Sequence, residues 1–278
     1  MTKQADTLLV AYDGSVDADL ALNWAAAEAR STGLRLRVLT VHDTSVTPWP
    51  PYESERDLER VAQAEVLVKE LGIDDAVVES KPGRIVPTIV QEAAGVALLV
   101  TGSQGHGRAG EIFVGSVSQH LARHATCPVV VVRTPKNPDS GRIVVGVDGS
   151  EESRAALEFA CRRAERTGEV VAALHAWKLH STPMDVNGPS REEIDRQFDE
   201  EDIVLGESVA GVRALFPDVV VLQESAPMPA HDLLVGASEN ASLVVTGSRG
   251  HGAFAGLLLG SVSNAVLHRA ECPVAVVR

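Results

Sequence analysis

Apolar and polar residues alternate along the first half of the chain in blocks that predict strands and helices in turn. Short apolar runs at 8–12, 34–41, 76–80, 96–100 and 129–132 have the length of buried strands. Ranges 17–31, 55–71, 84–94 and 116–124 have the length and apolar spacing of helices. Strands rich in Val and Leu that alternate with helices predict a parallel sheet with helices on both faces.

The second half, from Ile143 to Val277, repeats this order of elements. The sequence 10–15 matches 145–150, and 128–133 matches 273–278, so the offset grows from 135 to 145 residues. We expect the extra residues to follow Trp177. The segment between the halves is rich in Pro, Asn, Asp and Gly, which is typical of a linker. We therefore predict two domains, 1–135 and 142–278, joined by a linker at 136–141.

Composition narrows the class of protein. Hydrophobic residues make up 45% of the chain and charged residues 23%, as in globular proteins. The formal net charge of −13 disfavours nucleic acid and anionic membranes as partners. Three cysteines without a C-x-x-C pair argue against a disulfide framework. Because the N-terminal residues also lack an apolar signal sequence, we expect a cytoplasmic protein without a membrane segment.

A glycine motif occurs once in each half. Gly102, Gly105, Gly115 and Ser116 have the spacing G-x2-G-x9-G-S, and the second copy stands 145 positions later. Over the twenty residues 99–118 and 244–263, eleven are identical. Glycine lets a backbone approach a phosphate closely or take a positive φ. The repeat therefore predicts two copies of one ligand-binding loop, each followed by a helix whose N-terminus suits an anion.

An aspartate follows the first strand of each half, at Asp13 and Asp148. Ligands of open α/β sheets bind at the carboxyl ends of the strands, so the aspartates and the glycine loops would line one crevice if the first and fourth strands are neighbours. Simpler roles stay open: the glycines as turns, and the aspartates as turn formers before Gly. Ser15 and Ser150 fit helix N-caps better than ligand contacts.

Other ligand classes fit less well. Residues 105–110 satisfy G-x-G-x-x-G, but they follow a fourth strand and lack the acidic residue of a dinucleotide site. The pattern G-x4-G-K-[ST] is absent. His120 and His124 have the spacing of a helical metal pair, yet the second half does not repeat it. No nucleophilic triad can be assembled, so we expect a binding protein and not an enzyme.

With these motifs the chain resembles a tandem universal stress protein of the ATP-binding branch. The resemblance rests on the doubled glycine motif, the Asp-Gly-Ser after each first strand, and Gly-Ser-Val-Ser followed by Cys-Pro-Val. It implies two tandem α/β domains, Rossmann-like and similar to adenine nucleotide alpha hydrolases. Each would have a five-stranded parallel sheet of order 3-2-1-4-5, with helices on both faces and an adenine nucleotide between strands one and four.

The resemblance also implies which residues bind the nucleotide. The aspartates would contact the adenosine end, Val41 and Ala176 the adenine, and the glycine motifs the ribose and phosphates. The residues so implied are Asp13, Val41, Gly102, Gly105, Gly115, Ser116, Val117, Ser118, Asp148, Ala176, Gly247, Gly250, Gly260, Ser261, Val262 and Ser263. The cofactor would be ATP, with Mg²⁺ or Mn²⁺ bridging its phosphates.

These inferences predict an ATP-binding stress-response regulator with one adenine nucleotide per domain. Binding would order loops 102–114 and 247–259 and change the surface offered to a protein partner, with slow hydrolysis as a side activity. Three alternatives stay open: a cAMP-binding protein of the same fold, a slow ATPase, and a ligand-free interaction scaffold. The apolar last strands predict pairing of the two halves with each other, and a homodimer is compatible with this arrangement.

Overall fold

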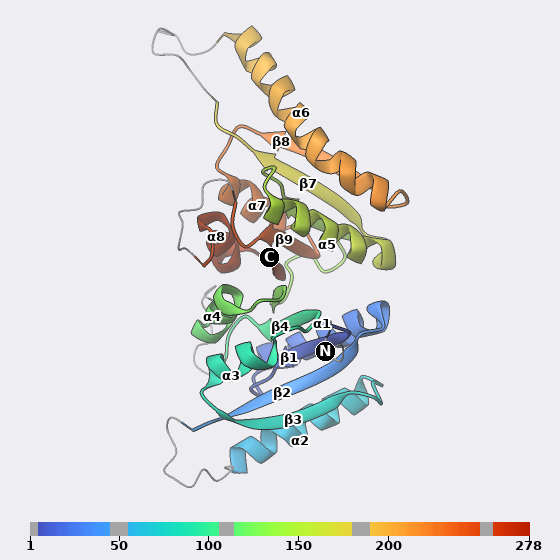
Figure 1. The fold of residues 1–278 in the computed structure, drawn as a ribbon, viewed down its shortest axis with the longest axis vertical. Helices are drawn as coiled ribbons and strands as arrows, with labels where there is room; N and C mark the ends of the chain where they lie inside the picture. Colours follow the sequence, from blue (N-terminus) through green and yellow to red (C-terminus); the bar gives the residue numbers. More distant parts are fainter. Residues whose placement is uncertain (1–4, 45–54, 106–113, 180–189, 251–257) are drawn as a thin grey trace. The chain divides into compact units, whose positions relative to one another are not determined.

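A computed structural model describes residues 5–44, 55–105, 114–179, 190–250 and 258–278. The chain divides into two compact units. The first comprises 1–134 with 267–269 and 273–276, and the second comprises 135–266 with 270–272 and 277–278. Figure 1 shows the elements of each unit. Residues 45–54, which include the predicted Pro-rich loop, and residues 106–113 and 251–257 of the two glycine loops lie outside the described part.

The first unit has the predicted parallel sheet, with strand order β3-β2-β1-β4-β5. Helices α1 and α2 contact each other, as do α3 and α4. The bounds of its elements are β1 Thr7–Ala11, α1 Val16–Thr32, β2 Arg35–Asp43, α2 Glu55–Glu70, β3 Val77–Gly83, α3 Ile85–Glu92, β4 Leu98–Gly102, α4 Ser116–His124 and β5 Val129–Val132.

The second half of the sequence repeats this arrangement, with strand order β8-β7-β6-β9-β10, so the expected fold is confirmed in both halves. Helix α5 packs against α6, and α7 packs against β6 and β7. The bounds are β6 Arg142–Gly146, α5 Glu151–Thr167, β7 Val170–Ala176, α6 Arg191–Leu215, β8 Val221–Ala226, α7 Ala230–Ser238, β9 Leu243–Gly247, α8 Ser261–Arg269 and β10 Val274–Val277.

The first helix of each unit begins and ends at residues whose chemistry fixes its length. Ser15 caps α1, because its hydroxyl accepts a hydrogen bond from the backbone N–H of Ala18 at 3.2 Å. Gly33 ends the helix in the left-handed conformation with φ of 70°. Ser150 and Gly168 do the same for α5. The N-cap role expected for both serines is therefore confirmed.

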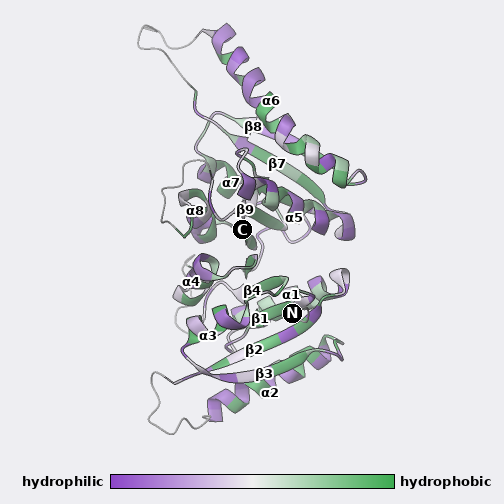
Figure 2. Ribbon diagram, in the orientation of Figure 1, coloured by the Kyte–Doolittle hydropathy of each residue, from purple (hydrophilic) through white to green (hydrophobic). Residues whose placement is uncertain are grey.

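The core of each sheet is built from its central strands. All residues of β1, β4 and β9 are buried, and Leu8 pairs in register with Leu36 on one side and Leu98 on the other. Figure 2 shows these strands as hydrophobic ribbons, while α2 and α6 carry many hydrophilic positions. Burial on both faces explains why the strands read as continuous apolar runs and not as alternating ones.

The two units differ in the helix that follows their second strand. Helix α6 has 25 residues against 16 in α2, which is where most of the extra length after Trp177 lies. Ser190 begins α6 with a capping box, in which its hydroxyl and the Glu193 carboxylate each accept a backbone N–H. Within the described ranges, no helix is both long enough and apolar enough to cross a bilayer.

Candidate functional site

The carboxyl ends of β1 and β4 lie side by side and open into a cavity of about 530 Å³, here called cavity 1. The corresponding ends of β6 and β9 open into cavity 2, of about 460 Å³. All sixteen sequence-predicted residues line one cavity or the other. Cavity 1 includes Asp13, Val41, Gly102, Gly105, Gly115, Ser116, Val117 and Ser118; cavity 2 includes Asp148, Ala176, Gly247, Gly250, Gly260, Ser261, Val262 and Ser263.

One end of each cavity is the N-terminus of a nine-residue helix. Gly115 precedes α4 and Gly260 precedes α8, and neither helix has a side-chain cap. The first residues, Ser116 and Ser261, are exposed and line the cavities. The first N–H groups of a helix lack partners within it and carry a positive partial charge, so this end suits an anion.

Ser118 and Ser263 differ in role from Ser116 and Ser261, although the sequence groups the four as hydroxyl donors toward a ligand. The Ser118 hydroxyl donates to the carbonyl of Gly102 at 2.6 Å, and both residues belong to the cavity wall. Ser263 makes the same bond to Gly247, also at 2.6 Å. The Ser118 hydroxyl therefore links α4 to β4, and the Ser263 hydroxyl links α8 to β9.

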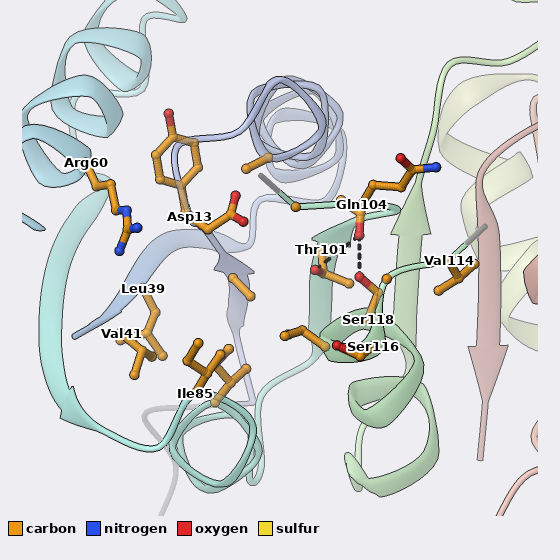
Figure 3. A pocket seen from close by; sticks show the side chains of 18 residues that line it. Asp13, Leu39, Val41, Arg60, Ile85, Thr101, Gln104, Val114, Ser116 and Ser118 are labelled. Atoms are coloured by element: carbon orange, nitrogen blue, oxygen red, sulfur yellow. Dashed lines mark hydrogen bonds between the residues drawn. The ribbon is translucent and has the colours of Figure 1, made fainter. Parts of the chain in front are cut away.

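The opposite end of cavity 1 is lined by apolar side chains and by Arg60. Leu39 and Val41 reach it from β2, and Ile85 and Ile89 reach it from α3. Figure 3 shows Leu39, Val41 and Ile85 together on one side, while Ser116, Ser118 and Gln104 lie on the other. The cavity thus has an uncapped helix N-terminus at one end and mainly apolar side chains at the other.

The motif glycines fit tightly against the protein itself. A Cβ on Gly102 would stand 2.6 Å from the carbonyl carbon and oxygen of Asp17, and one on Gly105 would stand 2.7 Å from Asp13 Oδ2. None of the six motif glycines is among the positive-φ glycines of the described residues. Close approach, and not an unusual backbone conformation, is therefore the physical requirement for glycine at Gly102, Gly105, Gly247 and Gly250, whereas a Cβ on Gly115 or Gly260 would stand 3.4 Å from its nearest neighbour.

Asp13 both forms a turn and faces cavity 1. Its Oδ1 accepts the backbone N–H of Ser15 at 3.0 Å, while its Oδ2 lies toward Gly105. Asp148 makes the same turn in the second unit, accepting the backbone N–H and the hydroxyl of Ser150 at 3.1 and 2.5 Å. The turn-forming role considered from the sequence is present, and it leaves the carboxylates at the cavity walls.

The segment after β4 is held against the first turn of α1. Asp17 Oδ2 accepts the Ser103 hydroxyl at 2.5 Å and the backbone N–H of Gln104 at 2.9 Å. In the second unit the Arg249 guanidinium pairs with Glu152 at 3.2 Å instead. Both arrangements fix the entry to the glycine loop before residue 106 or 251.

Tyr12 lines cavity 1 with its hydroxyl already engaged. The phenol is buried and donates to Asp19 Oδ1 at 2.5 Å. Burial, and then the hydrogen bond to the Asp19 carboxylate, raise the pKa of Tyr12 well above its ordinary value. The Tyr12 side chain therefore lines the cavity as an uncharged group. Val147 occupies the corresponding position in cavity 2.

Arg60 is a cavity residue that the sequence analysis missed. It lines cavity 1 from α2 and donates to Asp57 Oδ1 at 3.1 Å, while Asp57 Oδ2 lies 2.5 Å from the Nδ1 of His42. The sequence spacing offers a signal, because Ala64 and Val68 stand four and eight residues after Arg60, and both are buried in α2 together with Asp57. A position three residues after Asp57 shares that inward face.

Cavity 2 lacks this arrangement. Its end beside β7 is lined by Leu174, Ala176, Ala230, Leu233 and Leu234. Its wall contains no charged side chain from α6 among the described residues. The two cavities therefore share their glycine loops and differ at the end beside the second strand.

Aromatic and histidine side chains near β7 are engaged with protein groups. Trp177 is buried edge-on against Phe198, with ring centroids 4.8 Å apart, and it does not line cavity 2. His175 places Nδ1 2.8 Å from the carbonyl oxygen of Val147 and Nε2 2.9 Å from Glu201 Oε2. These contacts stabilise the carboxyl end of β7.

The described residues hold no group of three or more His, Cys, Asp or Glu side chains that could bind a metal ion. His120 and His124 stack with ring centroids 6.1 Å apart, and Nδ1 of His120 lies 2.6 Å from the carbonyl oxygen of Ser116. Among the described residues, each cavity is lined by one carboxylate, Asp13 in cavity 1 and Asp148 in cavity 2. A divalent cation at either cavity would thus take most of its ligands from phosphates and water.

Comparison with known proteins fits this geometry. The sequence profile of the Universal stress protein family matches residues 5–133 and 140–278. A universal stress protein of Mycobacterium bovis is 34% identical over 291 residues, which cover 98% of this chain and 96% of that protein. Another, from Mycobacterium tuberculosis, is 33% identical over 301 residues, with 98% and 94% covered.

A solved structure shares the fold over the full length. The crystal structure of a universal stress protein from Archaeoglobus fulgidus has a TM-score of 0.67 at 24% identity and covers 99% of both chains. Two α/β units with matched cavities at the carboxyl ends of their central strands define a tandem protein of this class. The chain belongs to the Universal stress protein family, with one family domain in each half.

Proposed function

We propose that each unit binds one adenine nucleotide, with ATP favoured, and that the chain acts as a nucleotide-dependent stress-response regulator. The observation that carries the proposal is the polarity of the two cavities. Each has an uncapped helix N-terminus with an exposed serine at one end and apolar side chains at the other. Cavities of about 530 and 460 Å³ lie within the usual range for small-molecule sites.

The triphosphate is held by backbone N–H groups and the helix dipole in this proposal. This mode of binding needs no lysine, which suits a chain with a net charge of −13. Mg²⁺ or Mn²⁺ would bridge the phosphates beside Asp13 or Asp148 and add positive charge there. The base would occupy the apolar end beside Val41 or Ala176.

A buried hydroxyl in cavity 2 supports a bound ligand. Thr246 lines the cavity at 3% exposure, and its Oγ1 has no hydrogen-bond partner within the part of the chain that the structure describes. Buried polar atoms in proteins nearly always have a partner. Rotation of the Thr246 side chain toward the cavity would let a ligand supply one.

We further propose that binding, and not turnover, is the activity. The described walls of both cavities contain no histidine or lysine, and the carboxylates in them are Asp13 and Asp148, each with one oxygen in a turn. A general base for water would have to come from these carboxylates. The nucleotide would instead change the surface that a protein partner meets, through a shift in the conformational population.

Charge placed at the helix N-terminus tests this proposal. Ser116→Glu puts a carboxylate at the first residue of α4, where it stabilises the helix but repels a phosphate. Ser116→Gln is the neutral control, and Ser261→Glu with Ser261→Gln repeats the pair in cavity 2. Calorimetry with Mg-ATP should give two sites per chain in the native protein, one in each single glutamate variant, and none in the double variant.

The outcomes separate the alternatives. Two sites that persist in the double glutamate variant would contradict the proposed anion site. Tighter binding of cAMP than ATP in a competition titration would favour the cyclic nucleotide, and no binding of either by the native protein would favour a ligand-free scaffold. Release of phosphate faster than about one per minute would indicate an ATPase.

A further inference from the structure

The end of cavity 1 beside β2 carries a cation, Arg60, that has no counterpart at the matching end of cavity 2. Among the described residues cavity 2 is lined by one arginine, Arg249, which comes from its glycine loop instead. Arg60 Nη1 donates to Asp57 Oδ1 at 3.1 Å, and Asp57 is held in turn by the ring of His42, with Nδ1 2.5 Å from Oδ2. Asp57 and His42 are buried, whereas the Arg60 side chain is 31% exposed. The guanidinium is therefore positioned by a buried pair while it remains open to the cavity.

The second unit places other chemistry at the matching positions. At the offset of 145 residues, Arg60 corresponds to Leu205, which is buried in α6 and does not line cavity 2. Asp57 corresponds to Asp202, whose Oδ1 accepts the hydroxyl of Ser225 at 2.6 Å. The described residues at this end of cavity 2 are aliphatic.

Figure 3 shows the Arg60 guanidinium on the same side of cavity 1 as Leu39 and Val41, away from Ser116 and Gln104. If the phosphates lie at the start of α4, the base lies at this apolar end and Arg60 faces it. Arginine has five N–H donors and no acceptor. It can therefore pair only with acceptors on the edge of the base.

The two common purines differ in what they offer such a donor. A 6-oxopurine presents two adjacent acceptors, N7 and O6, which match the guanidinium fork. Adenine presents N7 beside an amino group, which is itself a donor. We infer that Arg60 makes cavity 1 accept 6-oxopurine nucleotides, such as inosine or guanosine triphosphate, far better relative to ATP than cavity 2 does. This inference rests on the proposed function.

Inosine triphosphate is the sharpest probe, because it differs from ATP at positions 1 and 6 of the purine. Ser261→Glu leaves cavity 1 to be measured alone, and Ser116→Glu leaves cavity 2. In calorimetry, the ratio of ITP affinity to ATP affinity should be about tenfold higher for cavity 1 than for cavity 2, as expected for one good arginine–base contact.

Arg60→Leu in the Ser261→Glu background should bring the ratio down to that of cavity 2. Arg56→Leu is the matched control, since Arg56 is exposed on the same helix and does not line the cavity. Arg60→Gln keeps a long polar side chain and removes the charge, so it serves if the leucine variant unfolds. It too should lower the ratio.

The failures of the two ideas are distinguishable. If both cavities bind ATP and the ratio of ITP affinity to ATP affinity is the same in the two, the role of Arg60 is wrong and the proposed function stands. An Arg60→Leu variant that binds ATP and ITP with equally reduced affinity would also overturn the role of Arg60, because stacking or packing would then explain the loss. If neither the Ser261→Glu nor the Ser116→Glu protein binds a nucleotide, the proposed function and this inference are both wrong.

Discussion

Ser118 and Gly102 are joined by a 2.6 Å hydrogen bond from the serine hydroxyl to the glycine carbonyl. The bond closes the base of the glycine loop, because one residue ends β4 and the other lies in the first turn of α4. Its copy between Ser263 and Gly247 has the same length. The residues predicted to hold a ligand thus also hold the site in shape.

Ser118→Ala tests this structural role. The substitution leaves the buried Gly102 carbonyl without that donor, which should lower the free energy of unfolding by about 1–3 kcal/mol. Urea denaturation followed by circular dichroism measures the change. Ser116→Ala is the control, because that exposed serine should alter stability by less than about 0.5 kcal/mol. Equal losses in the two variants would contradict the assignment.

Gly102→Ala should destabilise the first unit whether or not a nucleotide is present. The new Cβ would stand 2.6 Å from the backbone carbonyl of Asp17, which cannot move without shifting the start of α1, so we expect a loss of about 1–3 kcal/mol. Thermal unfolding of the ligand-free protein measures it. Gly115→Ala is the comparison, since its Cβ would stand 3.4 Å from the nearest atom, the Ser103 carbonyl oxygen. A smaller loss at Gly102 than at Gly115 would contradict the packing.

Tyr12 should remain protonated at alkaline pH until the protein unfolds. Burial and the Asp19 carboxylate raise its pKa, so the stability that it contributes is present below its ordinary value of 10.0 and is lost only as pH rises toward the folded value. Absorbance at 295 nm reports tyrosinate. The native protein and Tyr12→Phe should give the same titration curve while folded, and a larger native signal near pH 10 would show the interpretation to be wrong.

Glu92 should contribute to stability at neutral pH and lose that contribution in acid. Burial alone would raise the pKa of Glu92, but hydrogen bonds from Lys81, at 2.6 Å, and from Arg37 lower it below its ordinary 4.5. A depressed folded pKa adds stability above the unfolded value, which is lost as pH falls. Glu92→Gln should therefore be less stable than the native protein at pH 7, and the gap should narrow below about pH 4.5 in urea denaturation.

The sequence predicted most of the fold because its signals are local. Helix α4 and strand β5 begin and end where the pattern places them, since the glycine before Ser116 and the proline before Val129 mark their starts. Strand β3 extends through Pro82 and Gly83, beyond the expected end at Ser80. Pairing with β2 from Val77 to Gly83 explains the extension, and no local pattern reveals that partner.

The site was predicted less completely than the fold. The glycine motifs located both cavities, but Arg60 comes from α2, whose place over the cavity depends on how the helix packs against β2 and β3. The roles of Ser118 and Gly102 likewise depend on partners 16 and 85 residues away in the chain, Gly102 and Asp17. Spacing identifies which residues surround a site, and the three-dimensional contacts decide which atoms remain free for a ligand.

The extra length of α6 has a consequence for how the two halves can diverge. The helix packs on β7 and on the edge strand β8, and its 25 residues begin at the capping box of Ser190 rather than at a cavity wall. Turns can be added or removed at that N-terminal end while β7 and β8 keep their register. The longer helix thus gives the second unit additional outer surface, and none of its described residues forms part of the wall of cavity 2.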